Sequence, residues 1–393
     1  MTKEVFALSA ARSAVGAFGG SLSSLAPEDL GSMVAREAFV RAGIDPAQAT
    51  YAVVGNVIPC GKNFPYVPRL VTVRAGMSMD STVMACNRLC GSAMQAIVSV
   101  AQNIVLGDAE IGLAGGVEVM SGGGYLSPAM RSGARMGDTQ MVDMMVAALT
   151  DPFGAGHMGI TAENQAIKWA ISREEQDAFA LESQQRAALA IAGGRFKSQI
   201  VPIILQTRKG DVVFDTDEHP KATSLESLAK MKPAFKKDGG TVTAGNASGI
   251  NDGAAFLVLA DAAATARAGG APMARLVAYA VAGVEASIMG DGPIPATQLA
   301  LKRAGLSLDQ IDVIEANEAF AAQALAVGKG LGLDPAKTNP NGGAIALGHP
   351  VGATGAVIVT KLLHEMLRVK ARYGLATMCI GGGQGITTIW ESC

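Results

Sequence analysis

Apolar residues along the chain change repeatedly from the spacing of a strand to that of a helix. Ser81–Cys86 is a short apolar run, typical of a buried strand. After the turn Asn87–Gly91, apolar residues recur at helical spacing up to Gly107, at Met94, Ile97, Ala101, Ile104 and Val105. Strand and helix patterns alternate in this way in both halves of the chain. This alternation predicts an α/β protein in which helices pack on sheets.

The two halves carry related segments. Arg41–Asn56 and Arg303–Asn317 each contain a helix ending at Arg-Ala-Gly, a short linker, an apolar strand and an asparagine. Glycine directly after a helix is a typical C-terminal cap. Further landmarks follow in the same order, Asn87–Gly91 and Leu113–Gly116 in one half, Asn341–Ala344 and Cys379–Gly383 in the other. We infer a duplication in which each half is a three-layer α/β unit.

Residues 121–245 differ in character from both halves. They begin with a glycine- and methionine-rich stretch. The capping box Ser172-Arg-Glu-Glu175 predicts the start of a helix that ends at Gly193, and Arg208–Asp211 predicts the turn of a hairpin. We therefore predict an N-terminal half over 1–120 and 246–270, an inserted loop domain over 121–245, and a C-terminal half over 271–393.

Composition and charge exclude several classes of protein. The 393 residues carry a net charge of −2, with 49% hydrophobic and 17% charged residues. A nucleic-acid-binding or membrane-surface protein would carry a basic excess, and a disordered chain would be less apolar. The uncharged stretches 89–107 and 338–360 contain too many polar residues or glycines to predict membrane spans. We expect neither a nucleic-acid partner nor a membrane partner.

The N-terminus and the cysteines indicate the compartment. Glu4 and the lack of a long apolar core argue against a signal peptide. Five widely spaced cysteines, an odd number, do not predict a disulfide framework. We expect a cytoplasmic protein in which some cysteines are reactive thiols.

Cys90 is the first candidate nucleophile. It lies between a predicted strand and a predicted helix, where the helix dipole and free N–H groups favour a thiolate. The small residues Gly91, Ser92 and Ala93 let a substrate approach the backbone. The alternative is a buried structural cysteine, which suits Cys86 better. A zinc site at Cys86 and Cys90 is disfavoured because no second ligand pair follows, so we predict no metal.

The C-terminal half adds a histidine and a second cysteine among small residues. His349 precedes the rigid Pro350 and is a candidate base for a thiol, although a packed structural histidine is the alternative. Cys379 leads into the glycine run Gly381–Gly383, whose unobstructed N–H groups suit an oxyanion hole. A dinucleotide loop fits poorly because the glycine spacing differs from that fingerprint. Asn317 could bind a water or carbonyl oxygen in the site, or bond its own backbone.

Together these segments resemble the thiolase family over essentially the whole chain. The matching motifs, in family order, are Asn87–Ser92, Gly115–Ser121, His157–Asn164, Thr243–Gly249, Asn317–Phe320, Gly348–Pro350 and Cys379–Gly385. Within the family, the chain is most similar to bacterial acetyl-CoA acetyltransferases and short-chain β-ketothiolases. The resemblance implies the thiolase fold, in which duplicated α/β halves form a five-layered αβαβα core that carries an inserted loop domain.

The resemblance also implies a ping-pong Claisen condensation and its reverse, thiolysis. Cys90 would be acylated with His349 as its base, and Cys379 would exchange a proton with the α-carbon of the second acetyl-CoA. One oxyanion hole would use His349 and a water held by Asn317, and the other the N–H groups of Cys90 and Gly381. A non-catalytic thiolase-like protein that binds acyl-CoA or lipid is the alternative, and the presence of all four side chains argues against it.

Coenzyme A is expected on the inserted loop domain, as a substrate and not as a cofactor. Five lysines against one acid between Lys221 and Lys237 suit its phosphates, although an ordinary solvated face is the alternative. By resemblance, the residues that bind it are His157, Met158, Lys221, Ser227, Phe235, Ser248 and Met289. The loop Asp217–Lys221 is one residue shorter than the family pattern, and Asp291 stands where a neutral residue is usual.

Family members form dimers or pairs of dimers. The methionine-rich segment Met130–Met145 is a candidate interface because methionine side chains adapt to irregular surfaces. We expect a homotetramer.

Overall fold

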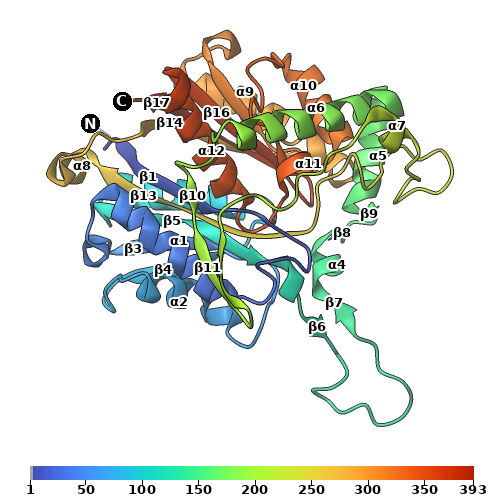
Figure 1. Ribbon diagram of the computed structural model, residues 1–393, viewed down its shortest axis with the longest axis horizontal. Helices are drawn as coiled ribbons and strands as arrows, with labels where there is room; N and C mark the ends of the chain where they lie inside the picture. The colour runs from blue at the N-terminus through green and yellow to red at the C-terminus, as the bar shows by residue number, and fades with distance from the viewer. Residues whose placement is uncertain (1–2) are drawn as a thin grey trace.

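The computed structural model describes residues 3–393 and has the two halves that the repeat predicts (Figure 1). The N-terminal half comprises β1 (Val5–Ser13), β2 (Gly16–Ala17), α1 (Pro27–Ala42), β3 (Tyr51–Gly55), α2 (Val67–Arg74), β4 (Thr82–Cys86), α3 (Ser92–Leu106), β5 (Ile111–Val119), β13 (Asn251–Asp261) and α8 (Ala262–Ala268). The C-terminal half comprises β14 (Ala274–Gly283), α9 (Pro293–Ala304), β15 (Val313–Ala316), α10 (Ala321–Leu331), α11 (Ala344–Leu347), α12 (Thr354–Val369), β16 (Tyr373–Ile380) and β17 (Gln384–Ser392).

The segment between β5 and β13 is built mostly of short elements outside the main sheet. They are β6 (Tyr125–Leu126), β7 (Val142–Asp143), α4 (Met144–Ala148), β8 (Thr150–Asp151), β9 (Gly156–His157), α5 (Met158–Lys168), α6 (Arg173–Ala192), β10 (Ile200–Val201), β11 (Ile203–Thr207), β12 (Gly210–Phe214) and α7 (Leu225–Ala229). The predicted capping box begins α6, and the predicted hairpin is β11–β12. After this segment, β13 pairs with β1 and β5, so the chain returns to the N-terminal half.

The repeated segments fold alike. The helices α1 and α9 both end at a glycine in the left-handed region, Gly43 with φ 64° and Gly305 with φ 68°. Glycine adopts this conformation without the Cβ clash that other residues suffer. The strands β3 and β15 follow, and each leads directly into an asparagine, Asn56 or Asn317. The duplication inferred from the sequence is therefore visible in the backbone.

The main strands follow one path, β15-β16-β17-β14-β1-β13-β5-β3-β4. The halves meet where β1 pairs with β14 over only two register positions, Phe6 with Arg275 and Ala7 with Ala274. Helices cover both faces of each half: α1 lies on β1, β5 and β13, and α9 lies on β14, β16 and β17. Between the halves, α3 packs on α12, which contacts strands of both. The layers are thus helix, sheet, helix, sheet and helix.

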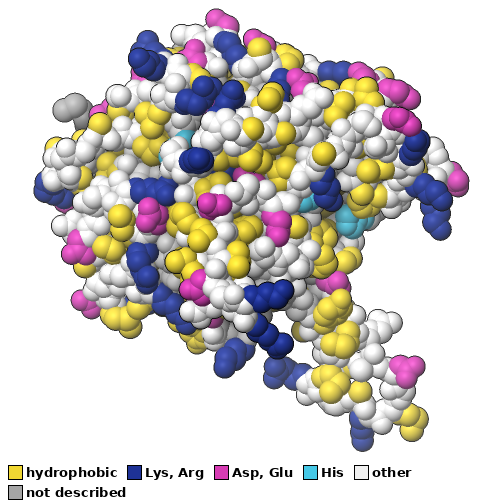
Figure 2. All heavy atoms as spheres, viewed as in Figure 1, with side chains coloured by type: hydrophobic (Ala, Val, Ile, Leu, Met, Phe, Trp, Pro, Cys, Tyr) yellow, Lys and Arg dark blue, Asp and Glu magenta, His cyan; other side chains and the backbone are white. Residues whose placement is uncertain are grey.

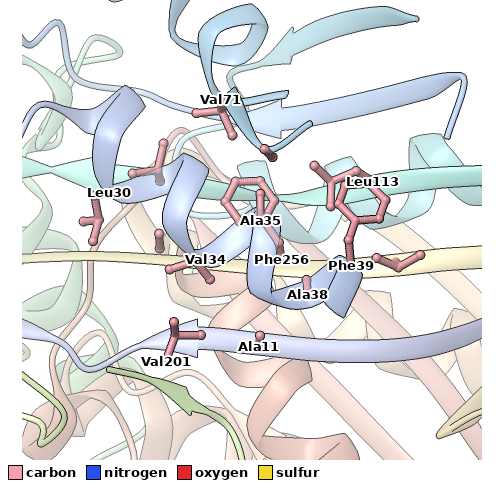
Figure 3. Packing of buried hydrophobic residues seen from close by; sticks show 14 of the residues in the cluster. Ala11, Leu30, Val34, Ala35, Ala38, Phe39, Val71, Leu113, Val201 and Phe256 are labelled. Carbon is pink, nitrogen blue, oxygen red and sulfur yellow. The ribbon is translucent and has the colours of Figure 1, made fainter. Parts of the chain in front are cut away.

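Side chains of β13 that point alternately to its two faces explain why helices cover both sides of the sheet. Ala254, Phe256 and Val258 belong to the hydrophobic cluster around α1, whereas Ala255, Leu257 and Leu259 belong to the cluster of α3 and α12. Successive side chains of a strand point to opposite faces, so an apolar strand with no polar alternation must be covered on both sides. Figure 3 shows Phe256 packed beside Phe39 and Ala35 of α1. Burying one such aromatic side chain contributes about 1.5–3 kcal/mol.

Two features of the fold bear on membrane and subunit contacts. Leu89–Leu106 is long and apolar enough to cross a membrane by length and composition, but α3 is a core helix packed between the halves. Residues 127–141 form an arm that extends from the paired strands β6 and β7 away from the body (Figure 1). Hydrophobic side chains lie along this arm in Figure 2, and Met130, Met136 and Met141 are exposed.

Candidate active site

Cys90 lies in a hydrogen-bonded turn just before α3. Leu89 has a positive φ of 48°, which is uncommon for a residue with a side chain. The Oγ of Ser92 donates to the Leu89 carbonyl at 2.6 Å and accepts the Arg88 N–H at 2.8 Å. Asn87 Oδ1 accepts the Leu89 N–H at 3.1 Å. These bonds hold the thiol at the N-terminus of a 15-residue helix.

The glycine run that follows Cys379 packs against this turn. A Cβ on Gly91 would lie 2.5 Å from Ile380 Cδ1, so the turn and the end of β16 approach more closely than a side chain would allow. Burial raises the pKa of the Cys90 thiol, while hydrogen bonds from the N–H groups of Gly381 and of Cys90 itself lower it. The thiol therefore needs a base, and the same two N–H groups are placed for an oxyanion formed beside the sulfur.

His349 is held in the turn between α11 and α12. Its backbone N–H donates to Asn251 Oδ1 at 2.9 Å, and its Nδ1 lies 2.6 Å from Thr354 Oγ1. Burial lowers the pKa of His349 to about 4, so the ring is neutral at pH 7. A neutral buried imidazole can accept a proton from a nearby thiol.

Three buried polar atoms at the site have no hydrogen-bond partner within residues 3–393. They are His349 Nε2 and both side-chain atoms of Asn317, Oδ1 and Nδ2. An unpaired buried polar group costs about 1–3 kcal/mol, so each of these atoms would be stabilised by a hydrogen bond from a bound ligand or water. This arrangement favours the binding interpretation of Asn317 over a loop residue that bonds its own backbone.

Cys379 lies near the end of β16 in a cluster of buried apolar side chains. It is fully buried and clusters with Met158, Met289 and Phe320. Burial raises its pKa, and a charge on Cys90 raises it further. The second cause means that the two sulfurs lie close enough to interact, so the cysteines from the two halves share one site.

An aromatic stack packs against the same cluster. His157 caps α5 by accepting the Gly159 N–H on Nδ1 at 3.1 Å, and its ring stacks on Phe235 with 4.7 Å between centroids. Phe235 meets Phe320 edge to face at 6.1 Å. Burial lowers the pKa of His157, which favours an uncharged ring beside Phe235. The structure thus brings His157, Met158, Phe235, Met289 and Cys379 together in one apolar cluster.

Family models match nearly the whole chain. The N-terminal domain of thiolase matches residues 5–263, and the C-terminal domain of thiolase matches residues 270–392. The chain belongs to the thiolase family. A β-ketothiolase of Cupriavidus necator is 55% identical over 392 residues, which cover 100% of both chains. An acetyl-CoA acetyltransferase of Pseudomonas aeruginosa is 51% identical over 387 residues, which cover 98% of each.

Solved structures show that this thiolase has the predicted fold. Human mitochondrial 3-ketoacyl-CoA thiolase superposes with a TM-score of 0.98 at 44% identity, covering 100% of both chains. The same human enzyme in complex with CoA gives a TM-score of 0.96 at 43% identity, covering 100% of this chain and 98% of that one. The predicted thiolase fold is confirmed.

The other residues predicted to bind CoA lie outside the apolar cluster around Cys379. Ser248 is half-buried and its N–H donates to the Ala319 carbonyl at 3.0 Å, beside Phe320. Lys221 and Ser227 are exposed on the segment that leads into and through α7. Ser227 interacts only locally, with its Oγ 3.1 Å from Ser224 Oγ. The structure therefore groups the apolar candidates but leaves Lys221 and Ser227 on the solvent side.

Both departures from the family pattern have structural partners in this thiolase. Asp291 accepts hydrogen bonds from Gln165, Lys168 and Trp169 at 2.7–3.0 Å, so its carboxylate faces the end of α5. Asp217 is buried and accepts a bidentate pair from Arg12, with N–O distances of 2.7 and 2.9 Å. The shortened loop is thereby attached to β1.

Sequence reasoning missed the residues that support the catalytic turns of this thiolase. Glu118 accepts N–H groups of Val57, Ile58 and Gly352, which joins the two halves beside His349. Burial raises its pKa to about 8, although these N–H groups lower it. Glu118 lies within the Gly115–Ser121 motif, but no local pattern shows its bond to Gly352, which is 234 residues away. Within residues 3–393, no group of His, Cys, Asp or Glu is arranged to hold a metal.

Proposed function

We propose that the protein is a CoA-dependent acyltransferase that condenses two acetyl-CoA molecules to acetoacetyl-CoA and CoA, and that cleaves short-chain 3-ketoacyl-CoA in reverse. The observation that carries the proposal is the grouping of the half-buried Cys90 and the buried Cys379 with a neutral histidine and unpartnered polar atoms. Full-length similarity to a β-ketothiolase and to acetyl-CoA acetyltransferases supports it. The substrates are CoA thioesters, and we expect no bound cofactor.

In the first half-reaction, His349 Nε2 takes the proton of the Cys90 thiol as the sulfur attacks the thioester carbonyl. The backbone N–H groups of Cys90 and Gly381 stabilise the oxyanion. In the resting protein the same two groups donate to the Cys90 sulfur. The C–S bond to CoA then breaks, and the CoA sulfur takes the proton from His349. Acetyl-Cys90 remains.

In the second half-reaction, Cys379 acts on the α-carbon of the next acetyl-CoA. Acetyl-Cys90 cannot ionise, so the negative charge on Cys90 that would raise the pKa of Cys379 cannot form. His349 Nε2 takes the proton of the Cys379 thiol, and the Cys379 thiolate takes the α-proton while the protonated His349 and Asn317 donate to the enolate oxygen. The carbanion attacks acetyl-Cys90, and the Cys90 thiolate leaves and takes the proton back from His349. In thiolysis, the protonated Cys379 returns a proton to the α-carbon.

We further propose that CoA passes between His157, Met158, Phe235 and Met289, with Ser248 beside its pantetheine arm and Lys221 and Ser227 near its phosphates. The solved complex of the human mitochondrial relative with CoA supports CoA binding by this fold. We propose that the protein acts in the cytoplasm, in fatty-acid metabolism, as a homotetramer built from two dimers.

The two cysteines provide the test. The native protein should consume acetoacetyl-CoA only when free CoA is present, and a panel of C4 to C8 3-ketoacyl-CoA substrates should define its chain-length range. Cys90→Ala should form no acyl-enzyme by mass spectrometry. Cys379→Ala should still become acetylated by acetyl-CoA but condense about 100- to 10,000-fold more slowly, the usual contribution of general acid–base catalysis.

Cys393→Ala is the matched control, since this cysteine is exposed at the end of the chain. It should leave both steps unchanged. Normal condensation by Cys379→Ala would show that the acid–base assignment is wrong. If no 3-ketoacyl-CoA of the panel were cleaved in a CoA-dependent manner, the protein would not be an active thiolase.

A further inference from the structure

Thr354 is the only side chain within residues 3–393 that is hydrogen-bonded to the His349 ring. Its Oγ1 lies 2.6 Å from His349 Nδ1, and the same hydroxyl donates to the Pro350 carbonyl at 2.9 Å. Both residues are buried, and the other ring nitrogen, Nε2, has no partner there. The position of the imidazole proton therefore depends on whether the Thr354 hydroxyl donates its hydrogen to His349 Nδ1 or to the Pro350 carbonyl.

The hydroxyl carries a single hydrogen and can donate it in only one direction. If it donates to Pro350 O, its lone pair accepts a proton from Nδ1, which gives two hydrogen bonds and leaves Nε2 as a bare acceptor. If it donates to Nδ1, the proton lies on Nε2, which gives one hydrogen bond and buries an N–H with no acceptor. Orphaned buried N–H groups are rarer than under-satisfied acceptors. The first arrangement is therefore the stable one.

We propose that Thr354 is a positioning residue that holds His349 in the tautomer protonated at Nδ1, so that Nε2 is the base for Cys90. The inference rests on the proposed function for its kinetic consequence, but the tautomer itself does not. Burial keeps the ring neutral at pH 7, since it lowers the His349 pKa to about 4, and a tautomer is defined only for the neutral ring.

The surroundings of His349 fix the ring from the backbone side as well. Asn251 Oδ1 accepts the His349 N–H at 2.9 Å, and Asn251 Nδ2 donates to the Gly16 carbonyl at 3.0 Å. Gly352, three residues after the histidine, donates to Glu118 at 2.9 Å. These contacts set the place of the turn but do not touch the ring nitrogens. Thr354 alone among them can select the tautomer.

Thr354→Val is the informative variant because it replaces the hydroxyl by a methyl group of similar size. Single-turnover acetylation of Cys90 by acetyl-CoA should slow about 10- to 100-fold, as when an outer partner that orients a histidine is removed. The acetyl-CoA concentration that half-saturates this step should stay the same. Thr354→Ser retains the hydroxyl and should regain at least half of the native rate.

Thr360→Val is the matched control. Thr360 is a buried threonine of the same helix whose hydroxyl has no partner among the described residues. Its replacement should leave the acetylation rate unchanged. If Thr354→Val reacted at the native rate, or if Thr354→Ser were as slow as Thr354→Val, Thr354 would not act through its hydroxyl and the proposal would be wrong.

A spectroscopic measurement separates this inference from the proposed function. The chain has only four histidines, so solid-state ¹⁵N NMR of histidine-labelled protein can be assigned with a His349→Gln difference spectrum. At pH 7 we expect the proton of His349 on Nδ1 in the native protein, and a shift towards Nε2 in Thr354→Val. A proton on Nε2 in the native protein overturns the inference. That result can be obtained even from a protein that transfers no acyl group.

Discussion

Burial acts in opposite directions on the two residues that begin the proposed reaction. It raises the pKa of the Cys90 thiol and lowers the pKa of His349 to about 4. Both shifts favour the neutral thiol and neutral imidazole over a thiolate–imidazolium pair. The proton should therefore move during the attack on the thioester, and not before it.

This neutral pair predicts an unusual pH profile. His349 is neutral, and so competent as a base, at every pH above its own pKa. The rate of Cys90 acetylation should therefore stay level from about pH 8 down to about pH 5 and fall only below that. The usual histidine pKa of about 6.5 would instead halve the rate near that pH. Single-turnover mass spectrometry across this range measures the profile.

His349→Asn provides the control for the profile. Without the base, only preformed thiolate reacts, so the acetylation rate should rise about tenfold per pH unit and should not level off below pH 9, because burial raises the Cys90 pKa. A native profile with an inflection near pH 6.5 would contradict the neutral pair. It would mean that His349 titrates with the usual histidine pKa and is not held neutral by burial.

At the scale of elements, the site depends on how closely α3 and α12 approach each other. Gly355 lies in the first turn of α12, and a Cβ there would lie 2.3 Å from the backbone nitrogen of Met94 in α3. A backbone atom cannot rotate away, so an added methyl group must push the two helices apart. The helix α3 begins two residues after Cys90, and α12 begins five residues after His349.

Gly355→Ala should therefore lower the free energy of unfolding by about 1–3 kcal/mol, as overpacking of a core does. It should also slow Cys90 acetylation in the molecules that remain folded. Urea denaturation and single-turnover acetylation measure the two effects.

Gly328→Ala is the matched control. Gly328 lies in α10, and a Cβ added there would have no atom within 4 Å, so the change should be neutral or stabilising by up to about 1 kcal/mol. Equal behaviour of the two variants would show that the close approach is not required.

The elements and their ends follow from local patterns, and the contacts between them do not. Helix ends at Gly43 and Gly305, the capping box at Ser172, and the strand that precedes Cys379 are all visible in short stretches of sequence. Recognition of the thiolase motifs supplied the rest of the predicted site. Nothing local indicates that Glu118 joins Gly352, or that β1 pairs with β14, because these partners lie more than 200 residues apart. Such contacts arise only when the halves pack.

At the scale of the whole molecule, the arm 127–141 has no place in the packing of a single chain. It extends from β6 and β7 into solvent, with Met136 97% exposed and Tyr125 61% exposed at its base (Figures 1 and 2). Apolar side chains exposed to water do not stabilise a monomer. Exposed apolar patches are typical of surfaces that bind another protein. The proposed catalytic groups, in contrast, all lie in the body of one chain. Assembly and chemistry should therefore be separable.

Shortening the arm tests this separation. Leu126 pairs with Val142, so the ends of the arm are adjacent, and a short Gly/Asn turn can replace residues 127–141. If the arm holds the proposed homotetramer together, the shortened protein should sediment as a dimer with about half the mass of the native protein, and each site should retain cleavage of acetoacetyl-CoA within a fewfold. A variant with Met130, Met136 and Met141 all changed to Ser keeps the length of the arm and should also weaken the proposed tetramer, because only the apolar contact is lost.

If both variants still sedimented as tetramers, the arm would not be the subunit contact. If they became dimers and lost activity completely, the site would depend on the assembly and not on one chain alone.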